Sequence, residues 1–115
     1  TYGEFYESRW YQAGSRLCPT HIDLPFQSQV PFGIDLLFQA GPATLGVEIC
    51  EDLWTPLPPS SWQALAGANV LVNLSASNET VGKAEYRRTL VTSQSGRCIA
   101  AYAYSSSGPG ESSTD

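Results

Sequence analysis

Apolar and polar residues alternate in the middle of the chain, and this alternation is its clearest structural signal. Leu45, Val47 and Ile49 are apolar at every second position, which is the period of a β-strand. The run ends in Cys50, and two acidic residues follow it directly. The pattern predicts a strand that delivers Cys50 to a turn at the edge of a sheet.

Two helices are expected after this strand. The segment 55–59 contains three prolines, which lack the N–H donor that a helix interior requires. Ser60 and Gln63 have the spacing of a capping box, and a first helix is therefore predicted over 60–66. A second helix is predicted over 81–94, and a glycine follows shortly after each of the two helices.

Two further strands are expected in the second half of the chain. Residues 69–74 read NVLVNL, a short apolar run that is typical of a buried strand. The loop 75–80 is polar, and residues 97–104 have the composition of a third strand.

The residues before Leu45 give weaker signals. The segment 14–29 is predicted to be irregular because it contains two prolines and several turn-forming residues. Residues 30–38 have the character of a strand, and a turn is expected over 39–43 around Gly41.

The order strand, helix, strand, helix, strand predicts an α/β fold with neighbouring parallel strands and right-handed crossovers. Ligands of such sheets bind beyond the carboxyl ends of the strands. Cys50, the loop 75–77 and the loop that begins at Ser105 each follow a strand. These three segments are therefore expected at one edge of the sheet.

Composition narrows the class of protein. The chain has 115 residues, of which 42% are hydrophobic, so one packed domain or part of a larger one is expected. Six basic and eleven acidic residues give a net charge of −5, which disfavours nucleic acid and anionic membranes as partners. No apolar run approaches the roughly 20 residues of a membrane-spanning helix, and no signal peptide is expected at the start.

Cysteine and histidine usage argues against disulfides and metals. The three cysteines are widely spaced and form no CxxC pair, which favours a reducing, cytoplasmic setting. One histidine without a ligand cluster predicts no metal site. Two readings of Cys50 stay open on these grounds: a reactive thiol at a ligand-binding edge, or a small buried side chain without chemistry.

Four motifs add a family resemblance. They are Gly-Val-Glu-Ile-Cys-Glu-Asp-Leu-Trp (46–54), Asn-Leu-Ser-Ala-Ser (73–77), Gly82-Lys83 with Arg87-Arg88, and Ser-Gly-Pro-Gly-Glu-Ser-Ser-Thr-Asp (107–115). In this order they resemble the glutamine-amidase domain of bacterial glutamine-dependent NAD synthetases, a domain of the carbon-nitrogen hydrolase (nitrilase) family. The opening segment 1–7 is similar to the stretch that follows the catalytic lysine of that family.

The resemblance implies part of a nitrilase-type α-β-β-α sandwich and a Glu-Lys-Cys triad that hydrolyses glutamine to glutamate and ammonia. Cys50 matches the nucleophile, and the backbone N–H of Glu51 would contribute to the oxyanion hole. Glu7 matches a supporting acid of the site. The positions that match contacts to glutamine are Tyr2, Ser77 and Lys83.

Each of these residues also has a purely structural interpretation. Tyr2 could simply pack, and Ser77 could be a turn residue, as serine often is after a strand. Lys83 could be a solvated surface lysine, although a cation near a helix start, where anions are favoured, supports a nearby anionic ligand. Glu7 could pair with Arg9 or Arg16.

The departures from the family pattern limit the expected activity. The general-base glutamate and the catalytic lysine of the family lie upstream of the segment that Thr1 matches, and Lys83 is the one lysine in this sequence. We therefore expect residues 1–115 to be a partial glutamine-amidase domain, inactive alone, with no synthetase domain. The parent enzyme would amidate deamido-NAD with ATP and Mg²⁺ on that separate domain, as a homo-oligomer.

Two other functions remain as alternatives at this point. The chain could be part of a stand-alone carbon-nitrogen hydrolase that acts on another amide or nitrile. It could also be a non-catalytic α/β interaction module with an inert cysteine.

Overall fold

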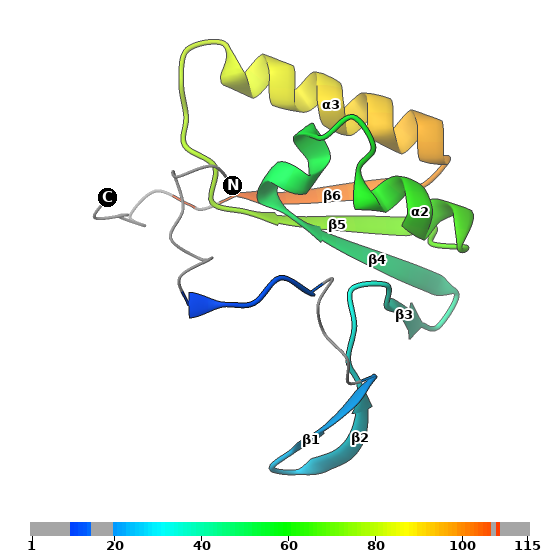
Figure 1. Cartoon of the computed structure of the whole chain (residues 1–115). Helices are drawn as coiled ribbons and strands as arrows, with labels where there is room; N and C mark the ends of the chain where they lie inside the picture. The colour runs from blue at the N-terminus through cyan, green and yellow to red at the C-terminus, as the bar shows by residue number, and fades with distance from the viewer. Residues whose placement is uncertain (1–9, 15–19, 107, 109–115) are drawn as a thin grey trace. The chain divides into compact units, whose positions relative to one another are not determined.

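The computed structural model describes residues 10–14, 20–106 and 108, and the chain divides into two compact units, 1–36 and 37–115 (Figure 1). The first unit contains a hairpin of β1 (His21–Leu24) and β2 (Gln27–Pro31). The Asp23 carboxylate accepts the backbone N–H of Gln29 at 2.8 Å across this hairpin. The prediction of irregular structure over 14–29 is wrong for these strands, which are mostly exposed and so lack a hydrophobic alternation.

The second unit is built on a four-stranded sheet in the order β3-β4-β5-β6. β3 runs antiparallel to β4, whereas β4, β5 and β6 are mutually parallel. Val47 lies opposite Val72, which in turn lies opposite Ala103. The strands are β3 (Leu37–Ala40), β4 (Ala43–Ile49), β5 (Val70–Ser75) and β6 (Ala101–Ser106).

The tight connection from β3 to β4 confirms the turn expected around Gly41, whose φ of +59° is readily adopted by glycine. The single strand expected over 30–38 is wrong. β2 ends at Pro31 and β3 begins at Leu37, with a bend between them.

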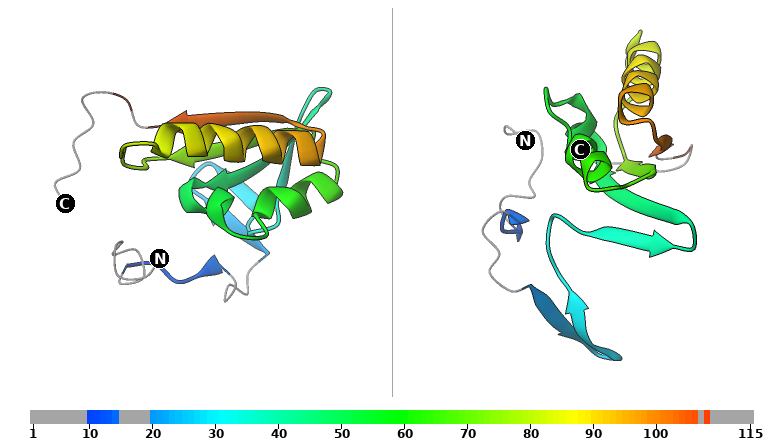
Figure 2. Two further views of the ribbon diagram at one scale, coloured as in Figure 1. Left: turned by 90° about the horizontal axis from the view of Figure 1, so that it is seen from above. Right: turned by 90° about the vertical axis from the view of Figure 1, so that its right-hand side faces the viewer.

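Both helices of the second unit cover the same face of the sheet (Figures 1 and 2). The helix α2 (Pro59–Leu65) lies within one residue of its predicted range, and the helix α3 (Lys83–Cys98) continues four residues past the expected end. Ile99, at φ +50°, ends α3. The following strand therefore begins at Ala101, and its predicted start at residue 97 is wrong. The α/β class is confirmed.

The predicted capping box of α2 is also wrong. The N-cap is Pro58, and the backbone N–H of Ser60 donates to the Glu48 carboxylate at 2.8 Å. The Gln63 amide donates to the carbonyl of Val47 at 2.7 Å. Both residues thus fasten α2 to β4, which is the strand that leads to Cys50.

The layer between sheet and helices combines a small apolar core with buried polar groups. The apolar core is formed by Ala68, Leu71 and Ala100. Glu48 is 2% exposed, and it accepts hydrogen bonds from the Ser60 N–H and the Tyr102 hydroxyl. A buried carboxylate with such partners anchors the end of β4 more specifically than apolar contacts alone would.

Candidate functional site at the end of β4

Cys50 lies at a sharp change of backbone direction. β4 ends at Ile49, and the 3₁₀ helix η2 (Cys50–Trp54) starts at once. The φ angle of Cys50 is +49°, in the left-handed region that is unfavourable by about 1–2 kcal/mol for a residue with a Cβ. Such strain persists where the surroundings impose it, and it is common at functional sites.

The side chain of Asn73 imposes this geometry. Its Oδ1 accepts the backbone N–H of Cys50 at 3.0 Å, and its Nδ2 donates to the Cys50 carbonyl at 3.2 Å. Asn73 is fully buried on the neighbouring strand β5. The backbone of Cys50 is therefore held on both polar groups by one rigid amide.

The thiol of Cys50 contacts a short chain of hydroxyl groups. The Ser75 hydroxyl lies 3.4 Å from Cys50 Sγ. It also accepts hydrogen bonds from the Tyr104 hydroxyl at 2.6 Å and from the backbone N–H of Ser77 at 3.1 Å. These hydrogen bonds connect residues of β5 and β6 to the sulfur of Cys50, which follows β4.

The first turn of η2, which begins at Cys50, contains backbone N–H groups without a partner inside the helix. In a 3₁₀ helix the first intrahelical bond is donated by the third residue, so the N–H groups of Cys50 and Glu51 have no partner within the helix. The Cys50 N–H is taken by Asn73, whereas the Asp52 carboxylate accepts the N–H of Ile49 at 2.8 Å. The Glu51 N–H, one residue after Cys50, is therefore the N–H of this turn for which neither the helix nor these side chains provide an acceptor.

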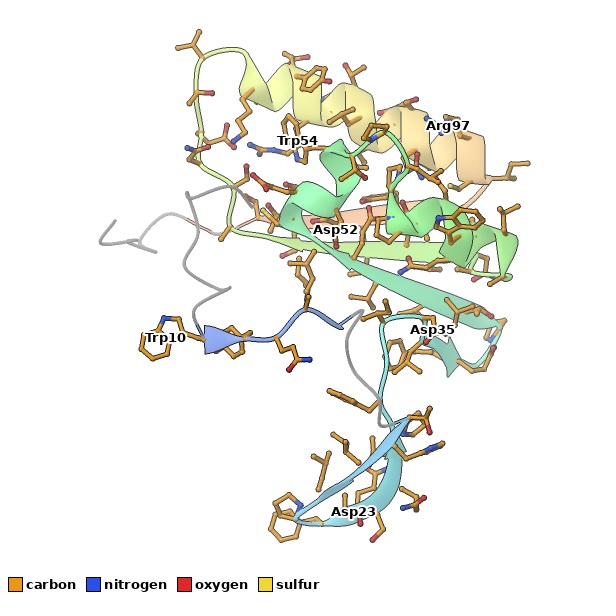
Figure 3. The ribbon with its side chains drawn as sticks, in the orientation of Figure 1. Trp10, Asp23, Asp35, Asp52, Trp54 and Arg97 are labelled. Carbon is orange, nitrogen blue, oxygen red and sulfur yellow. The ribbon has the colours of Figure 1, made fainter. Side chains whose placement is uncertain are left out.

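Lys83 is the first residue of α3, and it lies over η2. Its ammonium hydrogen-bonds Asn78 Oδ1 and sits 5.5 Å from the centroid of the Trp54 ring. The same ring packs against Tyr86 with centroids 5.3 Å apart. Figure 3 shows Trp54 between η2 and α3. These contacts place Lys83 against the last residue of η2, the helix that begins at Cys50.

Arg87 brings a second cation to this edge. The hydrogen bond with Glu79, at 2.5 Å, raises the pKa of the Arg87 guanidinium. Burial lowers this pKa, and the negative charges of Glu79, Tyr104 and, least, Cys50 raise it again. The guanidinium also lies 5.6 Å from the Tyr104 ring centroid. Its Nε and Nη2 are buried and have no acceptor among the described residues.

The structure thus brings four of the predicted site residues to one sheet edge, namely Cys50, Glu51, Ser77 and Lys83. Tyr2 and Glu7 lie outside the described residues. Sequence reasoning did not single out Tyr104, and it included Arg87 in a motif without assigning it a role. The signal for Tyr104 was its place on the predicted third strand, but a role followed only from the register that sets it opposite Asn73.

Two absences apply to the described part of the chain. Within 10–14, 20–106 and 108, no three His, Cys, Asp or Glu side chains come together as a metal would require. Over the same ranges, no helix has the length and apolarity needed to cross a membrane.

The arrangement defines an α/β protein with a candidate cysteine nucleophile. Its sulfur lies beyond the carboxyl end of a parallel strand, where donors and cations from three other elements converge.

Comparisons with known proteins show which enzymes the chain is similar to. Glutamine-dependent NAD(+) synthetase of Mycobacterium tuberculosis is 52% identical over 118 aligned residues, which cover all of this chain and 17% of that protein. The human enzyme of the same name is 38% identical over 98 residues, covering 78% of this chain and 14% of the relative. No protein-family model matches the sequence.

A solved structure agrees with these relatives. The crystal structure of a glutamine-dependent NAD(+) synthetase from Cytophaga hutchinsonii superposes with a TM-score of 0.69 at 35% identity, over 88% of this chain and 15% of that one. Over its whole length, the chain is similar to one part of the glutamine-dependent NAD(+) synthetases, and it spans 17% of the Mycobacterium relatives. The predicted resemblance is confirmed, as is the α/β fold class as part of a nitrilase-type sandwich.

Proposed function

We propose that this chain carries the nucleophile of a glutaminase whose ammonia is used to make NAD. The observation that carries the proposal is Cys50 itself. It occupies a strained turn at the end of a parallel strand, in a segment that matches glutamine-dependent NAD(+) synthetases along its whole length. An inert core cysteine requires neither the left-handed backbone nor the hydrogen-bonded sulfur.

The proposed reaction begins with the Cys50 thiolate. It attacks the side-chain amide carbonyl of glutamine, forming a C–S bond and a tetrahedral oxyanion. The C–N bond then breaks, and the nitrogen leaves as ammonia with the proton that a general base took from the thiol. Water hydrolyses the thioester, which releases glutamate and restores the thiol, so that glutamine and water become glutamate and ammonia.

The proposed roles of the other residues follow the family resemblance. The Glu51 N–H would stabilise the oxyanion, a role in which removing one donor typically slows catalysis about 100-fold or more. Ser77 and Lys83 would bind glutamine, and Lys83 adds a positive charge for its α-carboxylate. Tyr2 would contact glutamine as well, and Glu7 would be the supporting acid.

The remaining machinery is proposed to lie outside residues 1–115. The triad glutamate and lysine would come from residues upstream, so this chain alone is expected to be inactive. By the family resemblance, ATP, deamido-NAD and Mg²⁺ would bind a separate synthetase domain. The whole enzyme would be a cytoplasmic homo-oligomer without nucleic acid or membrane partners.

The test uses the full-length protein with deamido-NAD, ATP, Mg²⁺ and either glutamine or ammonium as nitrogen donor. Wild type should form NAD with both donors. Cys50→Ala should lose NAD synthesis from glutamine and retain synthesis from ammonium, because ammonium bypasses the thiol. Retention of glutamine-dependent synthesis in Cys50→Ala would refute the proposal.

The alternatives correspond to other outcomes of the same experiment. Release of ammonia from amides or nitriles without any NAD synthesis would indicate a stand-alone carbon-nitrogen hydrolase. Activity with ammonium alone, in wild type and variant alike, would indicate a non-catalytic module.

A further inference from the structure

We infer that Ser75, oriented by Tyr104, is a positioning residue that donates its hydroxyl proton to Cys50 Sγ and so favours the thiolate. The inference rests on the proposed function, because it concerns how the same nucleophile is prepared. It assigns a role to Ser75, which lies in the motif 73–77 without an expected contact, and to Tyr104, which lies in none of the four motifs.

Hydrogen-bond counting carries the argument. A serine hydroxyl has one proton to donate and two lone pairs to accept with. Ser75 Oγ already accepts from the Tyr104 hydroxyl at 2.6 Å and from the Ser77 N–H at 3.1 Å. Both lone pairs are therefore engaged, and the proton is directed to the remaining neighbour, Cys50 Sγ, at 3.4 Å. Sulfur in the position of an acceptor is better matched by a thiolate than by a thiol.

The fold keeps this orientation in place. Ser75 and Tyr104 project from the neighbouring parallel strands β5 and β6, and Asn73, opposite Tyr104, holds the backbone of Cys50. The acceptor sulfur and its donor are thus fixed by adjacent strands of one sheet. A rigid donor is needed because a mobile serine would turn its proton elsewhere.

Electrostatics act in the same direction. The Arg87 guanidinium lies over the Tyr104 ring, where a positive charge polarises the hydroxyl and makes it a stronger donor to Ser75. The same charge attracts a Cys50 thiolate, although the ion pair with Glu79 reduces this effect. The other charged side chains on β4, η2 and α3 are Glu48, Glu51, Asp52, Lys83, Glu85, Arg88 and Arg97.

Ser75 also connects the nucleophile to the loop that is proposed to bind glutamine. The hydroxyl that contacts Cys50 accepts the backbone N–H of Ser77. Movement of that loop on glutamine binding would therefore change the hydrogen bond between the Ser75 hydroxyl and Cys50 Sγ. This link predicts that loss of the Ser75 hydroxyl affects both kcat and the KM for glutamine.

The experiment follows alkylation of Cys50 by iodoacetamide in the full-length protein between about pH 5.5 and 9.5, with peptide mass spectrometry as the readout. Ser75→Ala should lower the rate near neutral pH about tenfold and move the midpoint of the profile up by about one pH unit. The rate at the alkaline plateau should be unchanged. Ser75→Thr keeps a hydroxyl and should restore the profile.

Tyr104→Phe provides a second, milder variant, because it keeps the ring under Arg87 and removes only the hydroxyl. Ser75 can then turn its proton away, and the neutral rate should fall about threefold. Two controls match these changes in residue type. Ser106→Ala removes an exposed serine opposite Ser75, and Tyr86→Phe removes a half-exposed hydroxyl on α3, and neither should move the profile.

A midpoint unchanged in Ser75→Ala, with melting as in wild type, would overturn the inference. So would a loss of rate that alkaline pH does not recover, since that indicates a structural role. If Ser75→Ala fails to fold, an unchanged profile in Tyr104→Phe has the same meaning. The readout needs no glutamine, so a shifted midpoint without glutamine-dependent NAD synthesis would reject only the proposed function.

Discussion

Asn73 and Cys50 are joined by two hydrogen bonds that run in opposite directions between one side-chain amide and one backbone residue. The amide is completely buried, and it comes from the strand next to the one that delivers the cysteine. This pair replaces the ladder bonds that are lost where β4 turns into η2. The geometry of the nucleophile is therefore a property of the sheet and not of the local turn alone.

Asn73→Ala should destabilise the protein by about 2–3 kcal/mol, because it leaves the N–H and carbonyl of Cys50 without partners at a half-buried position. Urea unfolding of the full-length protein measures this change. Asn69→Ala is the matched control. Asn69 also makes two backbone hydrogen bonds, to Thr44 and Pro42, but it is exposed and water can replace them, so a loss below about 1 kcal/mol is expected. Equal losses in both variants would contradict the assigned role.

Gly46→Ala should destabilise the protein by about 1–3 kcal/mol through overpacking. A Cβ at this position would lie 2.8 Å from Gln63 Cβ and 2.9 Å from Gln63 Cδ, against the side chain that ties α2 to β4. Gly96→Ala places the same methyl group in open space inside α3, where alanine is favoured by up to about 1 kcal/mol. The melting temperatures of the two variants should therefore move in opposite directions. If Gly46→Ala left the melting temperature unchanged, α2 would have to move away from β4 to make room for the added methyl group.

Cys98 should react with iodoacetamide far more slowly than Cys50 at about pH 7.5. Burial raises the pKa of the Cys98 thiol, and the positive charge of Arg97 opposes this shift only in part. Each unit of pKa changes the thiolate fraction about tenfold. Site-resolved mass spectrometry gives both rates, and unfolding in urea should make them similar. Equal rates in the folded protein would support an inert Cys50.

Stability should decline at alkaline pH because of Tyr102. Burial first, and then the hydrogen bond to Glu48, raise the pKa of Tyr102 above its ordinary value. The folded state thus favours the protonated phenol. Its contribution to stability is complete below the unfolded pKa of about 10 and is lost as the pH rises beyond it.

Urea unfolding between about pH 8 and 11 tests this dependence. Tyr102→Phe should show a weaker alkaline decline than wild type, since phenylalanine does not titrate. Tyr86→Phe, at a half-exposed tyrosine, should keep the wild-type decline. Identical profiles for wild type and Tyr102→Phe would assign the alkaline loss to other groups.

The central part of the fold could be predicted because its signals are local. The apolar alternation from Leu45 to Ile49 and the run 69–74 lie within strands of the observed sheet, and prolines and glycines delimit α2 correctly. The hairpin 21–31 could not be found, since its exposed strands need no alternation. The end of α3 was misplaced because Gly96 is tolerated inside a helix.

The site was predicted in part for a different reason. Chain order alone placed Cys50 and the loop 75–77 on one edge, because parallel strands present their carboxyl ends together. The contacts of Ser60 and Tyr104 depend on tertiary packing. Glu48, twelve residues before Ser60, takes the N–H that a local capping box was expected to satisfy. Local patterns in the sequence do not show which distant residues become hydrogen-bond partners after folding.

The left-handed backbone at Cys50 makes this position informative about selection. At a φ of +49°, glycine would be the more stable residue, since it has no Cβ to clash with the backbone. A fold shaped by stability alone would drift toward glycine here. A cysteine at this position therefore costs folding free energy that glycine would not, so its presence is not explained by stability alone.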